Sequence, residues 1–237
     1  MDEPRQTPSF RSFLAIALPP FILSLVVTVV CYIAAGSGLG LYLGGIALGT
    51  VLASPLVLAY RQRIEQLIAV ASIVDGVGVV WLVAMFRSDV TFAQWLAAYV
   101  LLAACVLAAM GVSIALERLV GVVSAAAATI TATLAWLTWP IWLSAWIDSP
   151  AVVRAIDWLV PIHPLLAMNG LFQSLGIWGE WPIMYQLTSL GQDVPYSFPS
   201  SVAISAAFHF LLGGALILAV GRRNDRPAVD EPDRAGR

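Results

Sequence analysis

Six apolar runs, each about as long as a membrane-spanning helix, constrain this chain more than any other feature. The runs cover residues 13–35, 39–60, 67–86, 95–116, 120–142 and 202–220. About twenty residues of α-helix rise roughly 30 Å, the thickness of the hydrocarbon core of a bilayer, and a helix satisfies its own backbone polar groups there. Only 11% of the residues are charged, against about a quarter in a soluble domain. The sequence therefore predicts an all-α, polytopic integral membrane protein with six transmembrane helices.

The runs divide the chain into three parts. A polar tail over residues 1–10 precedes the transmembrane domain at 11–220, and a charged, proline-bearing tail follows at 221–237. We interpret the first run as a retained helix, because it is about twice as long as a usual signal core and follows a tail without net positive side-chain charge. The composition of the C-terminal tail predicts that it is disordered.

Arginine and tryptophan predict the orientation of the helices. The chain has no lysine, and ten of its twelve arginines fall on one side of a six-helix layout: Arg5, Arg11, Arg61, Arg63, Arg118, Arg222, Arg223, Arg226, Arg234 and Arg237. All nine tryptophans fall toward the other side. Basic residues favour the cytoplasmic side and tryptophan favours the membrane interface, so we expect both tails in the cytoplasm and the protein in a bacterial inner membrane. The net charge of −2 gives no indication of a nucleic-acid partner.

One outer loop, over 148–201, contains an apolar stretch of its own. The stretch DWLVPIHPLLAMNGLFQSLGIWGEW covers residues 157–181. Residues 164–178 would form only about 22 Å of helix, which is too short to cross a bilayer, and proline suits a helix start. We therefore expect a re-entrant segment over 159–178 that enters the membrane and returns. An amphipathic helix lying flat on the membrane surface is the open alternative.

The sequence lacks the motifs of common catalytic sites. A P-loop is impossible without lysine, so the chain cannot hydrolyse ATP by that route. HExxH, GxSxG and CxxC are also absent, and His163 and His209 have no carboxylate at metal-ligand spacing. Cys31 and Cys105 lie in apolar runs and suit small core residues. We therefore expect no enzyme activity, no catalytic residue, no metal site and no cofactor.

Asp75 is the most unusual residue of the apolar runs. It lies in ASIVDGVGVVWL, about 12 Å along a helix counted from Leu67, where a carboxylate is costly and suggests a functional site. Two interpretations remain open: Asp75 belongs to a substrate path, or it joins two helices by hydrogen bonding to a serine or threonine. For His209 in the last run we expect a buried histidine with satisfied hydrogen bonds.

The layout as a whole resembles the ABC-2 type permease family. Six helices with both ends inside, and a broken, proline-started segment between the fifth and sixth, carry the resemblance over residues 11–222. At the level of residues it is carried by VVRAIDWLVPIHPLLAMNGLF, within about 150–172. The resemblance implies a dimer of two identical or two different permease subunits, with a substrate path between them. It also implies cytoplasmic ATPase subunits that bind ATP in place of this chain.

These expectations assign roles to specific positions. We expect the re-entrant segment to close the outer end of the path, with five gate residues: Pro161, His163, Pro164, Asn169 and Gln173. Asn169 and Gln173 lie four apart on one helix face and are expected to satisfy backbone groups freed by the prolines. The connection over 61–66 is shorter than the corresponding one in ABC-2 type permeases. Three of its residues match the positions at which the ATPase docks in that family: Arg61, Arg63 and Glu65.

The expected function is that of a permease subunit that moves an unidentified substrate with a separate ATPase. The alternative is a membrane scaffold subunit of a larger complex that does not itself transport. A scaffold needs no polar path and tolerates short loops.

Overall fold

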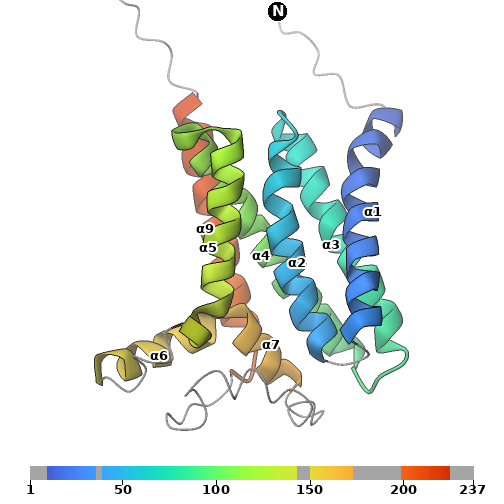
Figure 1. Ribbon diagram of the computed structural model, residues 1–237, viewed down its shortest axis with the longest axis vertical. Coiled ribbons are helices and arrows are strands. Elements are labelled where there is room, and N and C mark those ends of the chain that lie inside the picture. The colour runs from blue at the N-terminus through green and yellow to red at the C-terminus, as the bar shows by residue number, and fades with distance from the viewer. Residues whose placement is uncertain (1–9, 36–38, 143–149, 173–198, 225–237) are drawn as a thin grey trace, which may run out of the picture.

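The computed structural model describes residues 10–35, 39–142, 150–172 and 199–224, and within these ranges the chain forms helices and no strand. Figure 1 shows long helices side by side, with shorter ones across one end. The long helices are α1 (Phe10–Ala35), α2 (Leu39–Leu58), α3 (Arg63–Met85), α4 (Phe92–Val120), α5 (Val122–Trp142) and α9 (Ala203–Asn224). All six are long and apolar enough to cross a membrane, which confirms the predicted all-α architecture with six spans.

Two short helices lie between α5 and α9 in the chain. They are α6 (Pro150–Ile162) and α7 (Pro164–Phe172), and they meet at a bend of 72°. Both lie at the end of the bundle where α5 finishes and α9 begins (Figure 1). We call this the hinge end, and the end that holds Phe10 and Gly121 the opposite end. The broken pair between the fifth and sixth spans is the one that the sequence predicts.

The helices extend beyond the apolar runs because charged residues at a helix end can reach water while their backbone stays hydrogen-bonded. α3 begins at Arg63 rather than at residue 67. Glu117 and Arg118, expected in a connection, lie in the last turn of α4. The connection between α4 and α5 is Gly121 alone, whose φ of 81° lies in the left-handed region that glycine adopts without strain.

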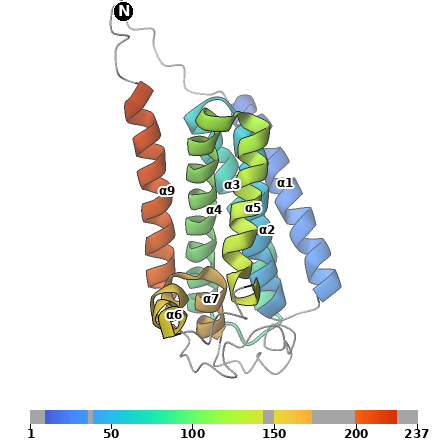
Figure 2. The same ribbon diagram turned by 60° about the vertical axis from the view of Figure 1, so that its left-hand side comes forward.

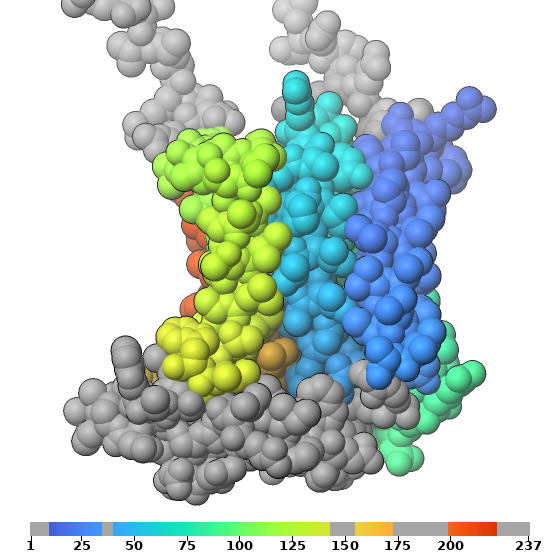
Figure 3. Space-filling view, in the orientation of Figure 1, coloured from blue at the N-terminus to red at the C-terminus, as the bar shows by residue number. Residues whose placement is uncertain are grey.

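α4 is the centre of the bundle. It packs against α2, α3, α5 and α9, and buried apolar side chains line it from Ala98 to Met110. α1 packs on α2 and α3 at one edge, and α9 packs on α4 at another. Figure 2 shows α9 and α5 on opposite sides of α4, and Figure 3 shows α5, α2 and α1 side by side across one face.

Charged and aromatic residues separate along the bundle. Six described arginines lie at the opposite end: Arg11, Arg61, Arg63, Arg118, Arg222 and Arg223. The described tryptophans lie toward the hinge end: Trp81, Trp95, Trp136, Trp139, Trp142 and Trp158. They do not all form an interface belt, because Trp81 and Trp139 are buried in the core. Trp81 donates its indole N–H to the carbonyl oxygen of Leu41 (3.3 Å), so its polar group needs no contact with the membrane interface.

α9 approaches α4 backbone to backbone. A Cβ added at Gly213 would lie 2.7 Å from the carbonyl oxygen of Leu107, and one added at Gly111 would lie 2.8 Å from the carbonyl oxygen of Gly213. Small residues let membrane helices pack this closely. At Gly214, the next residue of α9, an added Cβ would have no atom within 4 Å.

We predict that Gly213→Ala weakens the bundle, whereas Gly214→Ala does not. A methyl group at residue 213 must push two backbones apart, which costs about 1–3 kcal/mol, as overpacking does elsewhere. Alanine at residue 214 has open space and the helix preference that glycine lacks. Reversible unfolding of both variants in mixed detergent micelles measures the difference in free energy. Equal stability of the two variants would contradict the close contact between α4 and α9.

Candidate functional site

A single residue, His163, separates α6 from α7, and Pro164 starts α7. Proline suits the first helical position because its missing N–H would have no partner there. Pro161, also expected to start a helix, instead lies in the last turn of α6. The bend of the hinge is therefore centred on His163.

The two helices of the hinge differ in their surroundings. In α6, Asp157 and Trp158 are exposed while Ile156 and Val160 are buried, which is the pattern of a helix lying along a surface. In α7, every residue over 164–169 is buried, and the helix packs against α2, α4 and α9. Within the described residues, α6 is amphipathic and α7 is enclosed by the long helices. The re-entrant segment expected over 159–178 extends beyond these residues, and it stays a prediction together with the surface alternative.

His163 uses both ring nitrogens to satisfy backbone groups. Its Nδ1 accepts a hydrogen bond from the backbone N–H of Leu166 (3.2 Å), so the ring caps the start of α7. Its Nε2 lies 3.1 Å from the carbonyl oxygen of Trp136. The N–H can only donate and the carbonyl can only accept, so the imidazole is neutral and carries its proton on Nε2. The side chain is fully buried.

Pro140 explains why the carbonyl of Trp136 needs this partner. In an α-helix that carbonyl accepts a hydrogen bond from the N–H of residue 140, and proline has none. An unsatisfied peptide group within a membrane span costs several kcal/mol, because no water is available to pair with it. His163 supplies the missing donor from the bend between α6 and α7. The contact therefore ties the hinge to α5.

A second histidine, His209, ties α5 to α9, and Ser205 ties the hinge to α9. The indole N–H of Trp136 donates to Nε2 of His209 (3.3 Å), and Nδ1 of His209 donates to the carbonyl oxygen of Ser205 (2.7 Å). The hydroxyl of Ser205 donates to the carbonyl oxygen of Ile162, the last residue of α6 (2.8 Å). His209 is thus buried and hydrogen-bonded, as expected. The residues form a closed ring, which we call the hinge network: Trp136, Ile162, His163, Ser205 and His209.

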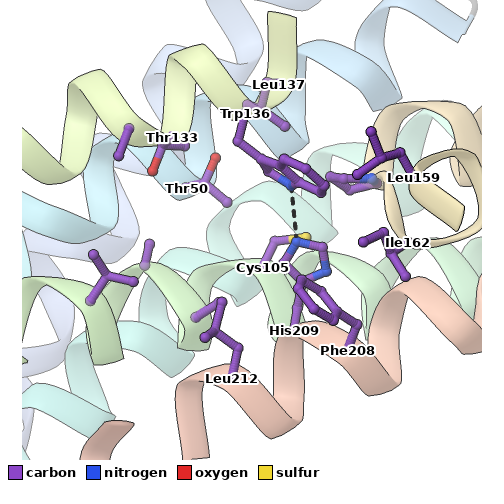
Figure 4. Close-up of a pocket in the computed structure, with 15 residues that line it drawn as sticks. Thr50, Cys105, Thr133, Trp136, Leu137, Leu159, Ile162, Phe208, His209 and Leu212 are labelled. Carbon is purple, nitrogen blue, oxygen red and sulfur yellow. Dashed lines mark hydrogen bonds between the residues drawn. The ribbon is translucent and has the colours of Figure 1, made fainter. Parts of the chain in front are cut away.

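An apolar cavity of about 410 Å³ lies beside the hinge network. α4 forms its floor with Cys105, α5 and α9 form its walls, and Ile162 and Pro164 of the hinge close one end. Figure 4 shows Trp136 and His209 facing each other in the cavity, joined by their hydrogen bond. The volume lies in the range of about 300–1,000 Å³ that is typical of small-molecule sites.

The cavity offers a ligand few polar atoms. Thr50 donates its hydroxyl hydrogen to the carbonyl oxygen of Ile46 at 2.7 Å, and Trp136 and His209 are paired with each other. In the ranges that the structure describes, no three His, Cys, Asp or Glu side chains gather as metal ligands do. The arrangement can hold an apolar molecule, and its histidines are engaged in holding helices together.

Asp75 lies in the middle of α3 on an exposed face, and it does not line the cavity. The hydroxyl of Tyr99 in α4 donates to its Oδ1 at 2.5 Å. Tyr99 in turn stacks on Trp95, with ring centroids 5.4 Å apart. The partner is therefore a tyrosine rather than the serine or threonine considered from the sequence. Asp75 joins α3 to α4, and the rest of its carboxylate faces outward.

Of the two amides assigned to the gate, only Asn169 lies in the part of the chain that the structure describes. Asn169 is buried in α7, and among the described residues its Oδ1 has no hydrogen-bond partner. Gln173 lies outside the described residues. His163 and Ser205 satisfy two carbonyls at the bend, and the expected role of Asn169 stays a prediction.

The residues assigned to docking lie together at the opposite end. Arg61 is exposed in the connection that precedes α3. Arg63 donates from Nη1 to Oε1 of Gln66 (3.3 Å), and Glu65 accepts from the backbone N–H of Gln62 (3.3 Å). Arg63 and Glu65 therefore also shape the first turn of α3, whereas Arg61 extends from the connection.

The sequence analysis did not predict the hinge network, although one feature of the sequence indicates that Trp136 needs a partner. Pro140, four residues after Trp136, marks a carbonyl without an intrahelical partner. Pro20 marks the carbonyl of Ile16 in the same way, and the hydroxyl of Tyr60 donates to it at 3.0 Å. At these two prolines a donor from outside the helix pairs with the freed carbonyl, as the lack of water in hydrocarbon requires. Which donor does so depends on packing that the sequence does not reveal locally.

Comparison of the chain with protein-family models, with curated proteins and with solved structures finds no match. The functional argument therefore depends on the hinge, the cavity and the arrangement of the six spans.

We predict that His163→Leu costs less stability in a Pro140→Ala background than in the original chain. In the original chain, leucine leaves the carbonyl of Trp136 and the N–H of Leu166 unpaired, at about 1–3 kcal/mol for each buried group. Alanine at residue 140 restores the N–H that pairs with that carbonyl, so one of the two losses disappears. A double-mutant cycle on the free energy of unfolding should give a coupling of about 1–2 kcal/mol. Strictly additive effects would show that Pro140 is not the reason for the contact.

Proposed function

We propose that the chain is the membrane-spanning permease subunit of an ABC-type transporter. The observation that carries this proposal is the hinge: α6 and α7 meet at 72°, and α7 is buried among the long helices. Helices broken at membrane depth are tolerated where protein or a water-filled cavity surrounds them, and transporters build substrate sites from such broken helices. The resemblance to ABC-2 type permeases depends on the same segment of the chain.

The hinge network suits the closed state of an outer gate. Opening by withdrawal of α7 must break the hydrogen bonds from His163 to Trp136 and from Ser205 to Ile162. The freed groups then need new partners, because unpaired groups cost several kcal/mol in hydrocarbon. The gate therefore stays closed until energy is supplied. Its proposed residues are Pro161, His163, Pro164, Asn169 and, beyond the described residues, Gln173.

A separate ATPase supplies that energy in this proposal. The chain has no lysine for a P-loop, so ATP binds to the partner subunit and not to this chain. The proposed docking surface is formed by Arg61, Arg63 and Glu65 at the opposite end. The excess of arginine at that end supports its location in the cytoplasm of a bacterium, together with both tails. A second permease subunit, identical or different, completes the path across the inner membrane.

A scaffold subunit that does not transport is the second candidate. It is favoured by the short connections at the opposite end, which are Gly121 alone between α4 and α5 and residues 59–62 between α2 and α3. Such connections leave little surface for an ATPase. In this case the contact between Asp75 and Tyr99 serves only to join helices.

We predict that the tagged chain, purified from its native cells in mild detergent, recovers an ATPase, and that Arg61→Glu lowers the recovery at least about tenfold. Reversing a charge in a docking surface brings like charges together, and tenfold corresponds to about 1.4 kcal/mol. Arg87→Glu makes the same change at an exposed site of the hinge end and should recover the ATPase in full. Recovery of other membrane subunits and no ATPase would favour the scaffold.

We predict that Asp75→Asn leaves assembly intact but abolishes ATP-dependent turnover of the purified complex in liposomes. The amide can still hydrogen-bond to Tyr99, so α3 and α4 stay joined, but it carries no charge to offer a substrate. Tyr99→Phe removes the helix contact and keeps the carboxylate, which makes it the matched control. Full turnover by the Asn variant would remove Asp75 from the substrate path.

A further inference from the structure

The cavity between α4, α5 and α9 opens sideways. Three of its lining residues are exposed, Ala132 on α5 and Phe208 and Leu212 on α9, whereas Cys105 on its α4 floor is buried. Ala132 lies ten residues from the start of α5 and Leu212 nine from the start of α9. The opening therefore lies near the middle of two helices that are apolar enough to span a bilayer. A molecule that enters here comes from hydrocarbon rather than from water.

Water does not suit this cavity. A buried water needs about two to four polar partners. The hydroxyl of Thr50 is paired with Ile46, and Trp136 is paired with His209. Among the hydroxyl, indole and imidazole groups of the described lining, only the hydroxyl of Thr133 could therefore bind a water, which is fewer partners than a water needs. An empty cavity does not suit it either, because every lining atom then forfeits its dispersion contacts. Dry apolar cavities of about 150 Å³ already bind small aromatic molecules, and this one measures about 410 Å³.

We propose that the cavity binds one acyl chain of a bilayer phospholipid, inserted between α5 and α9. A flexible alkyl chain is the apolar molecule that a bilayer presents at the highest concentration. Lipid tails are as apolar as the side chains around them, so moving an acyl chain from the bilayer into the cavity gains no hydrophobic free energy. The acyl chain binds because it fills the cavity and makes dispersion contacts there. The inference goes beyond the proposed transport function and applies equally to a scaffold subunit.

The bound acyl chain also stabilises the bend between α6 and α7. Leu159, Ile162 and Pro164 close the cavity at the hinge end, so an acyl chain packs against the residues on both sides of the bend. Ile162 belongs to the hinge network and Pro164 starts α7. Occupancy of the cavity therefore stabilises the bent arrangement of α6 and α7.

A photoreactive lipid tests the proposal. The full chain is reconstituted in phosphatidylcholine bilayers that contain a small fraction of phosphatidylcholine with a diazirine at the end of one acyl chain. After illumination, labelled positions are mapped by mass spectrometry. We expect label on the α4 floor, from Cys105 to Val112. Label confined to peripheral surfaces such as α1 would overturn the proposal, and so would labelling of the floor by a photoreactive fatty acid but not by the phospholipid.

Two variants of α5 form a matched pair for this experiment. Ala132→Phe places a phenyl group in the mouth of the cavity, and we expect it to lower labelling of the floor at least about tenfold, because the lipid chain must displace the ring. Ala128→Phe makes the same change one turn away at an exposed residue that does not line the cavity, and it should label as the original chain does. Equal labelling of the floor in both variants would contradict the inference.

Cys105 gives a second measurement that needs no substitution. It is a free, buried cysteine in the floor, whereas Cys31 is a free, half-buried cysteine on α1. In delipidated detergent, an apolar maleimide should react with both, and added phosphatidylcholine should protect Cys105 alone. Equal protection of the two cysteines would count against a bound chain. Neither measurement depends on an ATPase, so the transport proposal can fail while this one stands.

Discussion

A peptide group that enters hydrocarbon must find its hydrogen-bond partner within the protein. Two prolines inside the spans of this chain remove such a partner from their own helix. Pro140 leaves the carbonyl of Trp136 to His163, and Pro20 leaves that of Ile16 to Tyr60. In both cases the donor lies outside the weakened helix, at the bend between α6 and α7 for His163 and in the connection after α2 for Tyr60. A residue that weakens one helix thus creates a specific contact with another part of the chain.

The shape of the hinge end follows from these repairs. His163 attaches the bend to α5, Ser205 attaches it to α9, and His209 attaches α9 to α5. α5 and α9 both pack on α4, and the cavity separates them above this common floor. The hinge network therefore joins two helices that the packing on α4 keeps apart. The apolar cavity occupies the space that remains between them.

The six spans could be predicted because a span depends on local composition and on the thickness of the bilayer alone. The bend between the fifth and sixth spans could be predicted for a similar reason, since proline acts on its own helix. The exposed position of Asp75 could not. In a membrane helix the faces toward protein and toward lipid are both apolar, so periodicity does not separate inside from outside as it does in a soluble helix. The burial of Trp81 could not be predicted for the same reason. The hinge network could not be predicted either, because it joins residues more than sixty positions apart in the chain.

Two histidines buried together in a membrane protein suggest a route for protons, and the hydrogen bonds of this pair close that route. The ring of His163 lies between the amide N–H of Leu166 and a peptide carbonyl. The ring of His209 lies between an indole N–H and another peptide carbonyl. Each histidine thus accepts from an N–H group, amide or indole, that does not release its proton. Each donates to a peptide carbonyl, which cannot pass a proton on. The hydrogen bonds of the two histidines therefore join α5, α9 and the bend, and they do not form a continuous proton relay.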